Sequence, residues 1–178
     1  MINYVLKKQK EIIYIFFLLI FSISFNQHYG YIGVNPIDSF FSFNSGYDIF
    51  NGHYPFKDYW TITGPFLDII QAIFFKIFGV SWFSYVLHAS VFNFIIAIST
   101  FYTLNKFSLR IEYSFLYSIL VSVLAYPTAG TPFSDHHVTI LSIIGLFCFI
   151  LSLKTDKKIY WFFLPIFFGF AFLSKQAP

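Results

Sequence analysis

The chain has 178 residues, of which 57% are hydrophobic and 11% charged, and its formal net charge is +3. This balance lies far from that of a soluble domain and indicates an integral membrane protein. The basic residues lie beside apolar stretches rather than in one continuous patch, so the charge does not indicate a nucleic-acid partner.

The chain begins with a basic segment followed by an apolar run. Residues Met1–Glu11 contain three lysines, and Ile12–Phe25 is apolar. This order is shared by signal peptides, but no small-x-small cleavage site follows. We therefore expect an uncleaved first span over roughly residues 12–29.

A polar segment, Asn35–Pro65, comes next and is the longest part of the chain without a span-length apolar run. We expect residues 30–83 to form an external loop that contains interfacial helices. The helix predicted for Pro65–Gly79 is about 15 residues long, short of the roughly 20 needed to cross a bilayer. Its polar residues Asp68, Gln71 and Lys76 fall within about 140° on a helical wheel, which favours a position in the membrane interface.

Four further apolar runs predict four more spans, so the expected fold is an all-α integral membrane protein with about five transmembrane helices. Residues 1–178 are expected to form one membrane domain. The four runs cover residues 84–104, 111–126, 138–153 and 159–173.

Charge then predicts the orientation. With the 65–79 helix at the interface, most lysines and arginines fall on one side and Asp38, Asp48, Asp58, Asp68 and Asp135 fall on the other. The positive-inside rule makes the basic side, and with it the amino terminus, cytoplasmic. The acidic loops are then external.

Asp38 is the first candidate catalytic residue, because it follows the first span at the membrane surface. A carboxylate in such a place can act as a general base or a metal ligand. The alternative is a helix N-cap for the following segment, for which Asp is a favoured residue.

A second cluster, Asp135, His136 and His137, opens the run at 138–153. Carboxylate and imidazole groups are ligands for Mg, Mn or Zn, which makes a divalent ion a candidate cofactor. Adjacent side chains on a helix diverge by about 100°, so capping of the helix by Asp135 and an interfacial histidine pair are the alternative.

Several other polar residues are candidate ligand contacts. His53 and Lys57 are candidate phosphate contacts, although an exposed loop His or Lys is usually just solvated. Lys175 is a stronger candidate, because a cation near the membrane interface is costly unless it snorkels or binds an anion. The single cysteine, Cys148, lies in an apolar run, which favours a packing role.

The motif GHYPFKDYW–TITGPFLDIIQAIFFKIFG resembles the GT-C membrane glycosyltransferases related to protein mannosyltransferases, aminoarabinose transferases and rhizobial lipopolysaccharide transferases. The resemblance extends back to Asp38, forward to Asp135, and on to GFAFLSKQAP at the end of the chain. The residues that match the central motif are Gly52, Tyr54, Pro55, Phe56, Asp58, Tyr59, Gly64, Pro65, Phe78 and Gly79.

The resemblance implies transfer of a sugar from a polyprenyl-phosphate donor to a glycan, lipid or protein acceptor at the outer face of a bacterial inner membrane. Asp38 would activate the acceptor hydroxyl. Asp135 with His136 or His137, through a divalent ion, and Lys175 would stabilise the departing phosphate. Tyr54, Asp58 and Tyr59 would belong to the donor or acceptor loop. The rings of Tyr54, Tyr59 and Trp60 would stack on sugar or anchor the loop at the interface, and anchoring is favoured.

Two departures from the family pattern bear on this interpretation. Ser39 follows Asp38 where many relatives have a second acidic residue. The chain also has fewer spans than such enzymes usually have, so we expect it to be the N-terminal part of a longer enzyme. The alternatives are a non-catalytic multi-pass membrane protein, such as a remnant or assembly partner, and, less favoured, a transporter, because the spans hold few ionisable groups.

Overall fold

The structure, a computed structural model, is an all-α bundle. It describes residues 2–33, 38–61 and 63–175, with side chains from Lys8 onward in the first range and from Ser39 onward in the second. Within these ranges the only β-type pairing is an isolated bridge between Pro55 and Tyr59. The predicted all-α fold is therefore confirmed. The helices are α1 (Ile2–Gly30), α2 (Asp38–Phe50), α3 (Phe66–Phe78), α4 (Trp82–Lys106), α5 (Ile111–Leu124), α6 (Ser134–Thr155) and α7 (Lys158–Ser174).

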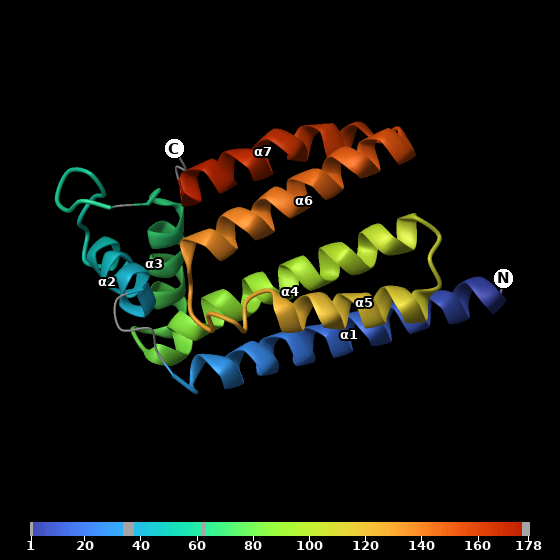
Figure 1. Cartoon of the computed structure of the whole chain (residues 1–178), viewed down its shortest axis with the longest axis horizontal. Helices are drawn as coiled ribbons and strands as arrows, with labels where there is room; N and C mark the ends of the chain where they lie inside the picture. The colour runs from blue at the N-terminus through green and yellow to red at the C-terminus, as the bar shows by residue number, and fades with distance from the viewer. Residues whose placement is uncertain (1, 34–37, 62, 176–178) are drawn as a thin grey trace.

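Five helices, α1, α4, α5, α6 and α7, run side by side, and α2 and α3 lie together at one end of them (Figure 1). Of the described helices, three are long and apolar enough to cross a membrane: Lys8–Gly30, Trp82–Lys106 and Ser134–Thr155. The apolar helices α5 and α7 have 14 and 17 residues, which is shorter than a full crossing requires. Because both run alongside the longer helices, five spans remain the prediction.

The basic ends of the long helices gather at the end of the bundle opposite α2 and α3 (Figure 1). Lys10 Nζ donates to Glu112 Oε1 at 3.4 Å and so joins the start of α1 to the start of α5. Lys154 Nζ lies 4.1 Å from the centre of the Phe107 ring. The predicted separation of basic and acidic segments is therefore present in the fold, while its assignment to inside and outside remains a prediction.

Buried amides hold α1, α4 and α5 together. Asn93 on α4 is fully buried, and its Nδ2 donates to the carbonyl oxygens of Ser22 at 3.1 Å and Ser122 at 2.9 Å. Its Oδ1 accepts from the backbone N–H of Tyr126 at 3.3 Å. Small residues and polar side chains at helix contacts are the usual means of association where lipid weakens the hydrophobic driving force.

The close approach of α1 to the turn between α5 and α6 depends on two glycines. Gly130 has φ +71°, and a Cβ there would lie 2.8 Å from the Cα of Gly30. Only glycine combines this backbone conformation with this contact. The contact fixes where α6 begins.

Helix α3 crosses the end of the bundle (Figure 1) and confirms the helix predicted between Pro65 and Gly79. Its polar stripe does not behave as a single surface, because Asp68 and Gln71 are fully buried whereas Lys76 is exposed. The exposed face instead carries Ile73, 47% exposed, and Ile77, 66% exposed. The polar face is turned inward against α2 and α4, which leaves the apolar face outward, and the predicted position in the membrane interface stays a prediction.

Candidate functional site

The end of the bundle that holds α3 also brings together the first turn of α6 and the end of α7. The segment before α6 contains Pro127, Gly130 and Pro132, which interrupt helical hydrogen bonding and end α5 before Ala125. The chain then re-enters a helix at Ser134. This placement puts Asp135, His136 and His137 in the first turn of α6.

Asp135 and Lys175 form an ion pair between Oδ1 and Nζ. Their side chains are 53% and 38% exposed respectively, so the pair lies at the surface, where it adds little to stability. The two residues were predicted separately, as a metal ligand and a phosphate contact. The structure brings them together, so that the carboxylate orients the ammonium group.

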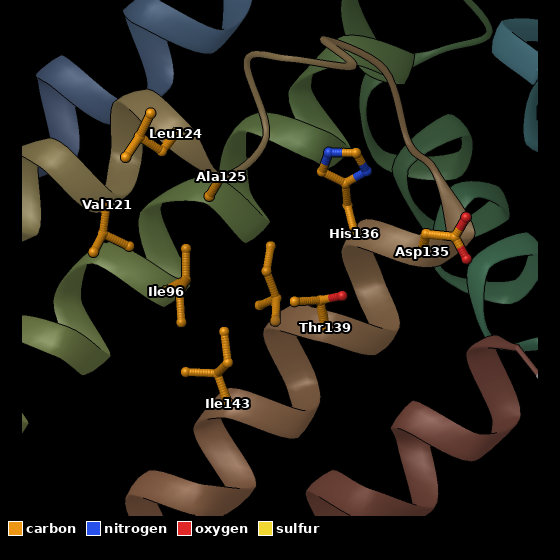
Figure 2. Close-up of a pocket in the computed structure, with 9 residues that line it drawn as sticks. Ile96, Val121, Leu124, Ala125, Asp135, His136, Thr139 and Ile143 are labelled. Atoms are coloured by element: carbon orange, nitrogen blue, oxygen red, sulfur yellow. The ribbon is translucent and has the colours of Figure 1, made fainter.

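A pocket of about 390 Å³ lies between α4, α5 and α6, beside this ion pair (Figure 2). Its polar residues, Asp135, His136 and Thr139, come from the first turns of α6, and the remaining lining is aliphatic or alanine. A long apolar group with a charged head matches this arrangement. The lining residues are Ile96, Val121, Leu124, Ala125, Asp135, His136, Thr139, Ile140 and Ile143.

His136 has one nitrogen occupied and one available. Its Nε2 lies 3.0 Å from the hydroxyl of Thr128, and that hydroxyl donates to the Ala125 carbonyl at 3.2 Å. His136 Nε2–H is therefore the donor of the first bond, because a hydroxyl has a single hydrogen. Nδ1 is buried and has no hydrogen-bond partner among the described residues. This nitrogen is an acceptor in the neutral ring and a donor in the protonated ring.

His137 turns away from His136 into the core. Its Nε2 lies 2.9 Å from Nε2 of His88, and its Nδ1 contacts the Tyr126 hydroxyl. His88 Nδ1 in turn lies 2.9 Å from Gln71 Oε1 on α3. A continuous buried hydrogen-bonded chain thus joins α3, α4 and α6. Burial raises the pKa of Tyr126, in the turn before α6, so its hydroxyl stays protonated.

Asp68, in the first turn of α3, is fully buried and accepts a hydrogen bond from the Tyr59 hydroxyl at 3.3 Å. Burial raises the pKa of Asp68 to about 7, against hydrogen bonds from Thr61 and Tyr59 that lower it. Burial and the neighbouring carboxyl also raise the pKa of Tyr59. Tyr59, predicted as a loop residue, is thus tied to α3, where it restrains Asp68.

The other predicted loop residues interact with one another. His53 Nδ1 lies 3.4 Å from Asp48 Oδ1, and Lys57 Nζ lies 4.0 Å from Asp58 Oδ1. Asp58 Oδ2 accepts from the backbone N–H of Tyr54 at 2.8 Å, which closes the turn. These contacts explain the loop's shape, and the predicted phosphate and sugar contacts of His53, Lys57, Asp58 and Tyr54 stay predictions.

Asp38 begins α2, and its side chain lies outside the described residues. Its predicted catalytic role therefore stays a prediction. The start of α2 belongs to the same end of the bundle as α3, since the two helices pack together (Figure 1).

The residues present do not form a metal centre as they are placed. Asp135 is paired with Lys175, His136 faces the pocket, and His137 is buried against His88. Across residues 2–33, 38–61 and 63–175, no three His, Cys, Asp or Glu side chains gather to hold an ion. The divalent ion stays a prediction.

Sequence reasoning did not find His88, although the signal was present. A histidine within the apolar run at residues 84–104 is costly in a membrane unless it is paired, so it marks a polar partner on another helix. Asp68 and Gln71 were noticed only as part of the polar stripe of a predicted interfacial helix. Their inward direction depends on α4, which the local pattern does not specify.

Taken together, the fold and the site define a polytopic membrane protein with charged groups and an imidazole beside an apolar pocket at one end of its bundle. The sequence profile of the dolichyl-phosphate-mannose-protein mannosyltransferase family matches residues 63–177, more than half of the chain, and the chain belongs to this family. The family places the chain among glycosyltransferases of the GT-C type, as the resemblance implied. Comparison with curated proteins and with solved structures gives no significant match.

Proposed function

We propose that this chain carries the donor-binding part of a glycosyltransferase that moves a sugar from a polyprenyl-phosphate carrier to an acceptor at the outer face of the membrane. The observation that carries the proposal is the Asp135–Lys175 pair beside an apolar pocket headed by His136. A polyprenyl phosphate has the same two parts, a long apolar chain and an anionic head. Family membership supports a lipid-linked sugar donor together with an acceptor.

In this proposal the isoprenoid tail occupies the pocket between α4, α5 and α6, and the phosphate lies at the first turn of α6. The tail remains in the apolar part of the membrane while the head reaches the water. Lys175 supplies positive charge to the phosphate, and Asp135 holds the ammonium in place. A phosphate beside His136 favours the protonated ring, whose free Nδ1–H then donates to it.

The reaction forms a bond between the acceptor oxygen and the anomeric carbon of the sugar, and it breaks the bond from that carbon to the carrier phosphate oxygen. The acceptor proton passes to a carboxylate, for which Asp38 is our candidate. The leaving phosphate gains negative charge, and Lys175 and His136 stabilise it. Preorganised charge of this kind is usually the largest contribution to catalysis.

The proposal is tested by measuring sugar transfer from polyprenyl-phosphate-linked sugars in membranes that contain the protein. Asp38→Asn should abolish transfer while the protein remains inserted in the membrane. Asp48→Asn, which changes a carboxylate in the same helix, is the matched control and should retain transfer. Full transfer by Asp38→Asn would remove Asp38 from its role, and absence of transfer from any polyprenyl-phosphate sugar by the unmodified protein would contradict the function.

A further inference from the structure

Two histidine rings, those of His88 and His137, are in contact in the core. Their Nε2 atoms are 2.9 Å apart, and both side chains are fully buried. Two N–H groups cannot point at each other at this distance, and two lone pairs would repel. The contact therefore holds one hydrogen, carried by one ring and accepted by the other.

The second nitrogen of each ring then determines the tautomers. If His137 donates through Nε2, a neutral His88 carries its hydrogen on Nδ1, where it donates to Gln71 Oε1 at 2.9 Å. His137 Nδ1 then accepts from the Tyr126 hydroxyl. If the Gln71 amide is reversed, every bond reverses, and His137 Nδ1–H donates to Tyr126 and to the Phe133 carbonyl at 3.3 Å. In both directions one ring is the Nδ1–H tautomer and the other is the Nε2–H tautomer.

Neutral rings fit this setting, because among the described residues the other hydrogen-bond partners of the two rings carry no charge that would compensate a protonated imidazole. His88 packs against Phe74 at a ring-centre distance of 5.1 Å, and Phe92 lies 4.1 Å from His137. The groups in hydrogen-bond contact with the pair are an amide, a hydroxyl and a backbone carbonyl. A charged imidazole among these apolar rings would be expensive.

The chain joins the two parts of the proposed site. Gln71 lies one turn after Asp68 on α3, and His137 lies one residue after His136 on α6. A pair of apolar rings would fill the same space but would leave α6 free to rotate slightly. Directional hydrogen bonds on both nitrogens of His88 set the rotation of α6 relative to α3.

We propose that His88 and His137 form a neutral pair of opposite tautomers and act as positioning residues that hold the first turn of α6, with Asp135 and His136, in register with α3. The purpose of this register rests on the proposed function. The tautomer pair itself does not, and this separates the two in experiment. Detecting opposite tautomers in a protein without transfer activity would contradict the proposed function and leave the pair intact.

The tautomers are measured directly by 15N NMR of the whole chain, labelled with 15N-histidine, in lipid nanodiscs at neutral pH and without added ligand. The chain has five histidines, which single substitutions assign. We expect one Nδ1–H and one Nε2–H signal from His88 and His137. Identical tautomers, or a charged ring in the pair, would overturn the proposal, as would stoichiometric copurified zinc, because a metal would take both Nε2 lone pairs.

The positioning role is tested with variants that remove the hydrogen bonds of the two His88 nitrogens one at a time. His88→Gln places a polar atom near the former Nε2 and keeps the contact with His137, whereas His88→Asn keeps only the contact on the Gln71 side. His88→Phe fills the volume without hydrogen bonds. The same three substitutions at His28, an exposed residue on α1, are the matched controls.

The readout is the distance between nitroxide labels on α3 and α6, attached at Ile73→Cys and Thr139→Cys in a Cys148→Ser background. We expect a narrow distribution that His88→Gln retains and that His88→Asn broadens at least twofold, with no change in the His28 controls. Unchanged distributions in His88→Asn and His88→Phe would contradict the positioning role. If His88→Phe does not fold, the comparison of His88→Gln with His88→Asn still decides the question.

Discussion

Lys175 Nζ contacts Asp135 Oδ1 and so joins the end of α7 to the first turn of α6 across 40 residues of sequence. Neither residue is deeply buried, so the pair contributes little to folding. Its importance lies in fixing an ammonium group beside an apolar pocket. Removal of the charge should therefore affect the reaction more than the fold.

The first prediction concerns this ammonium group. Lys175→Gln should lower the kcat of sugar transfer on the order of 100-fold, the loss typical of removing one group that stabilises developing charge. Lys175→Arg should retain more activity because it keeps the charge. Lys154→Gln, at the opposite end of the bundle, is the control and should leave transfer unchanged. Equal activity of Lys175→Gln and the unmodified protein would contradict the role.

The second prediction concerns the pH dependence of stability. The pKa of Asp68 is about 7 in the folded protein and near 3.8 without burial, so the folded state holds an extra proton between these values. Stability should fall as the pH rises from about 4 to about 7, by about 4 kcal/mol at most at 1.36 kcal/mol per pKa unit.

Asp68→Asn should remove this dependence, because the amide stays neutral and can still accept from Tyr59. Thermal unfolding in detergent should give similar Tm values for the two proteins at pH 4 and a higher Tm for the variant at pH 8. Asp156→Asn, which changes an exposed carboxylate after α6, is the control and should not alter the pH dependence. A Tm difference that is the same at both pH values would show that Asp68 ionises freely.

The third prediction concerns the amide that joins α1, α4 and α5. Asn93→Ala removes donors to two carbonyl groups and an acceptor for the Tyr126 N–H, all buried. We expect a loss of about 1–3 kcal/mol of stability, the usual cost of leaving buried polar groups unpaired. Denaturant titration measures it, with Asn105→Ala near the end of the same helix as the matched change. A loss of stability no larger than that of Asn105→Ala would contradict the role of Asn93 in joining the three helices.

The fourth prediction concerns the contact between the loop before α3 and the end of α7. A Cβ on Gly64 would lie 1.7 Å from the Leu173 carbonyl oxygen, so Gly64→Ala must displace the backbone. We expect a lower Tm and, because Lys175 lies only two residues after Leu173, reduced transfer. Gly169→Ala, where a Cβ meets nothing within 4 Å, is the control and should be neutral or slightly stabilising. Equal Tm values for the two variants would contradict this packing.

Much of the helical order could be predicted from local signals. Pro65 and Gly79 bracket α3. The apolar run at residues 84–104 ends just before Lys106, which is the last residue of α4. These signals work because helix ends depend on nearby residues. The run at residues 111–126 was predicted to continue to Tyr126, but α5 ends at Leu124, and the Tyr126 N–H donates to the Asn93 side chain instead of continuing the helix.

The site was harder to predict because it depends on pairs of residues far apart in the chain. Asp135 and Lys175 were each noticed, but their pairing depends on α6 and α7 lying side by side. His88 was missed because its partners, Gln71 and His137, lie on two other helices. Helical periodicity gives the face of a residue, not the helix that covers it.

The central claim is that the pocket headed by His136, beside the Asp135–Lys175 pair, receives the donor's lipid. A photoactivatable polyprenyl phosphate, incubated with the protein in nanodiscs and mapped by mass spectrometry, tests it most directly. We predict labelling of α5 and α6 at pocket residues such as Val121 and Ile143, displaced by undecaprenyl phosphate and reduced in Lys175→Gln. Labelling that undecaprenyl phosphate does not displace, or that falls on the exposed faces of α1 and α7 instead, would contradict the account.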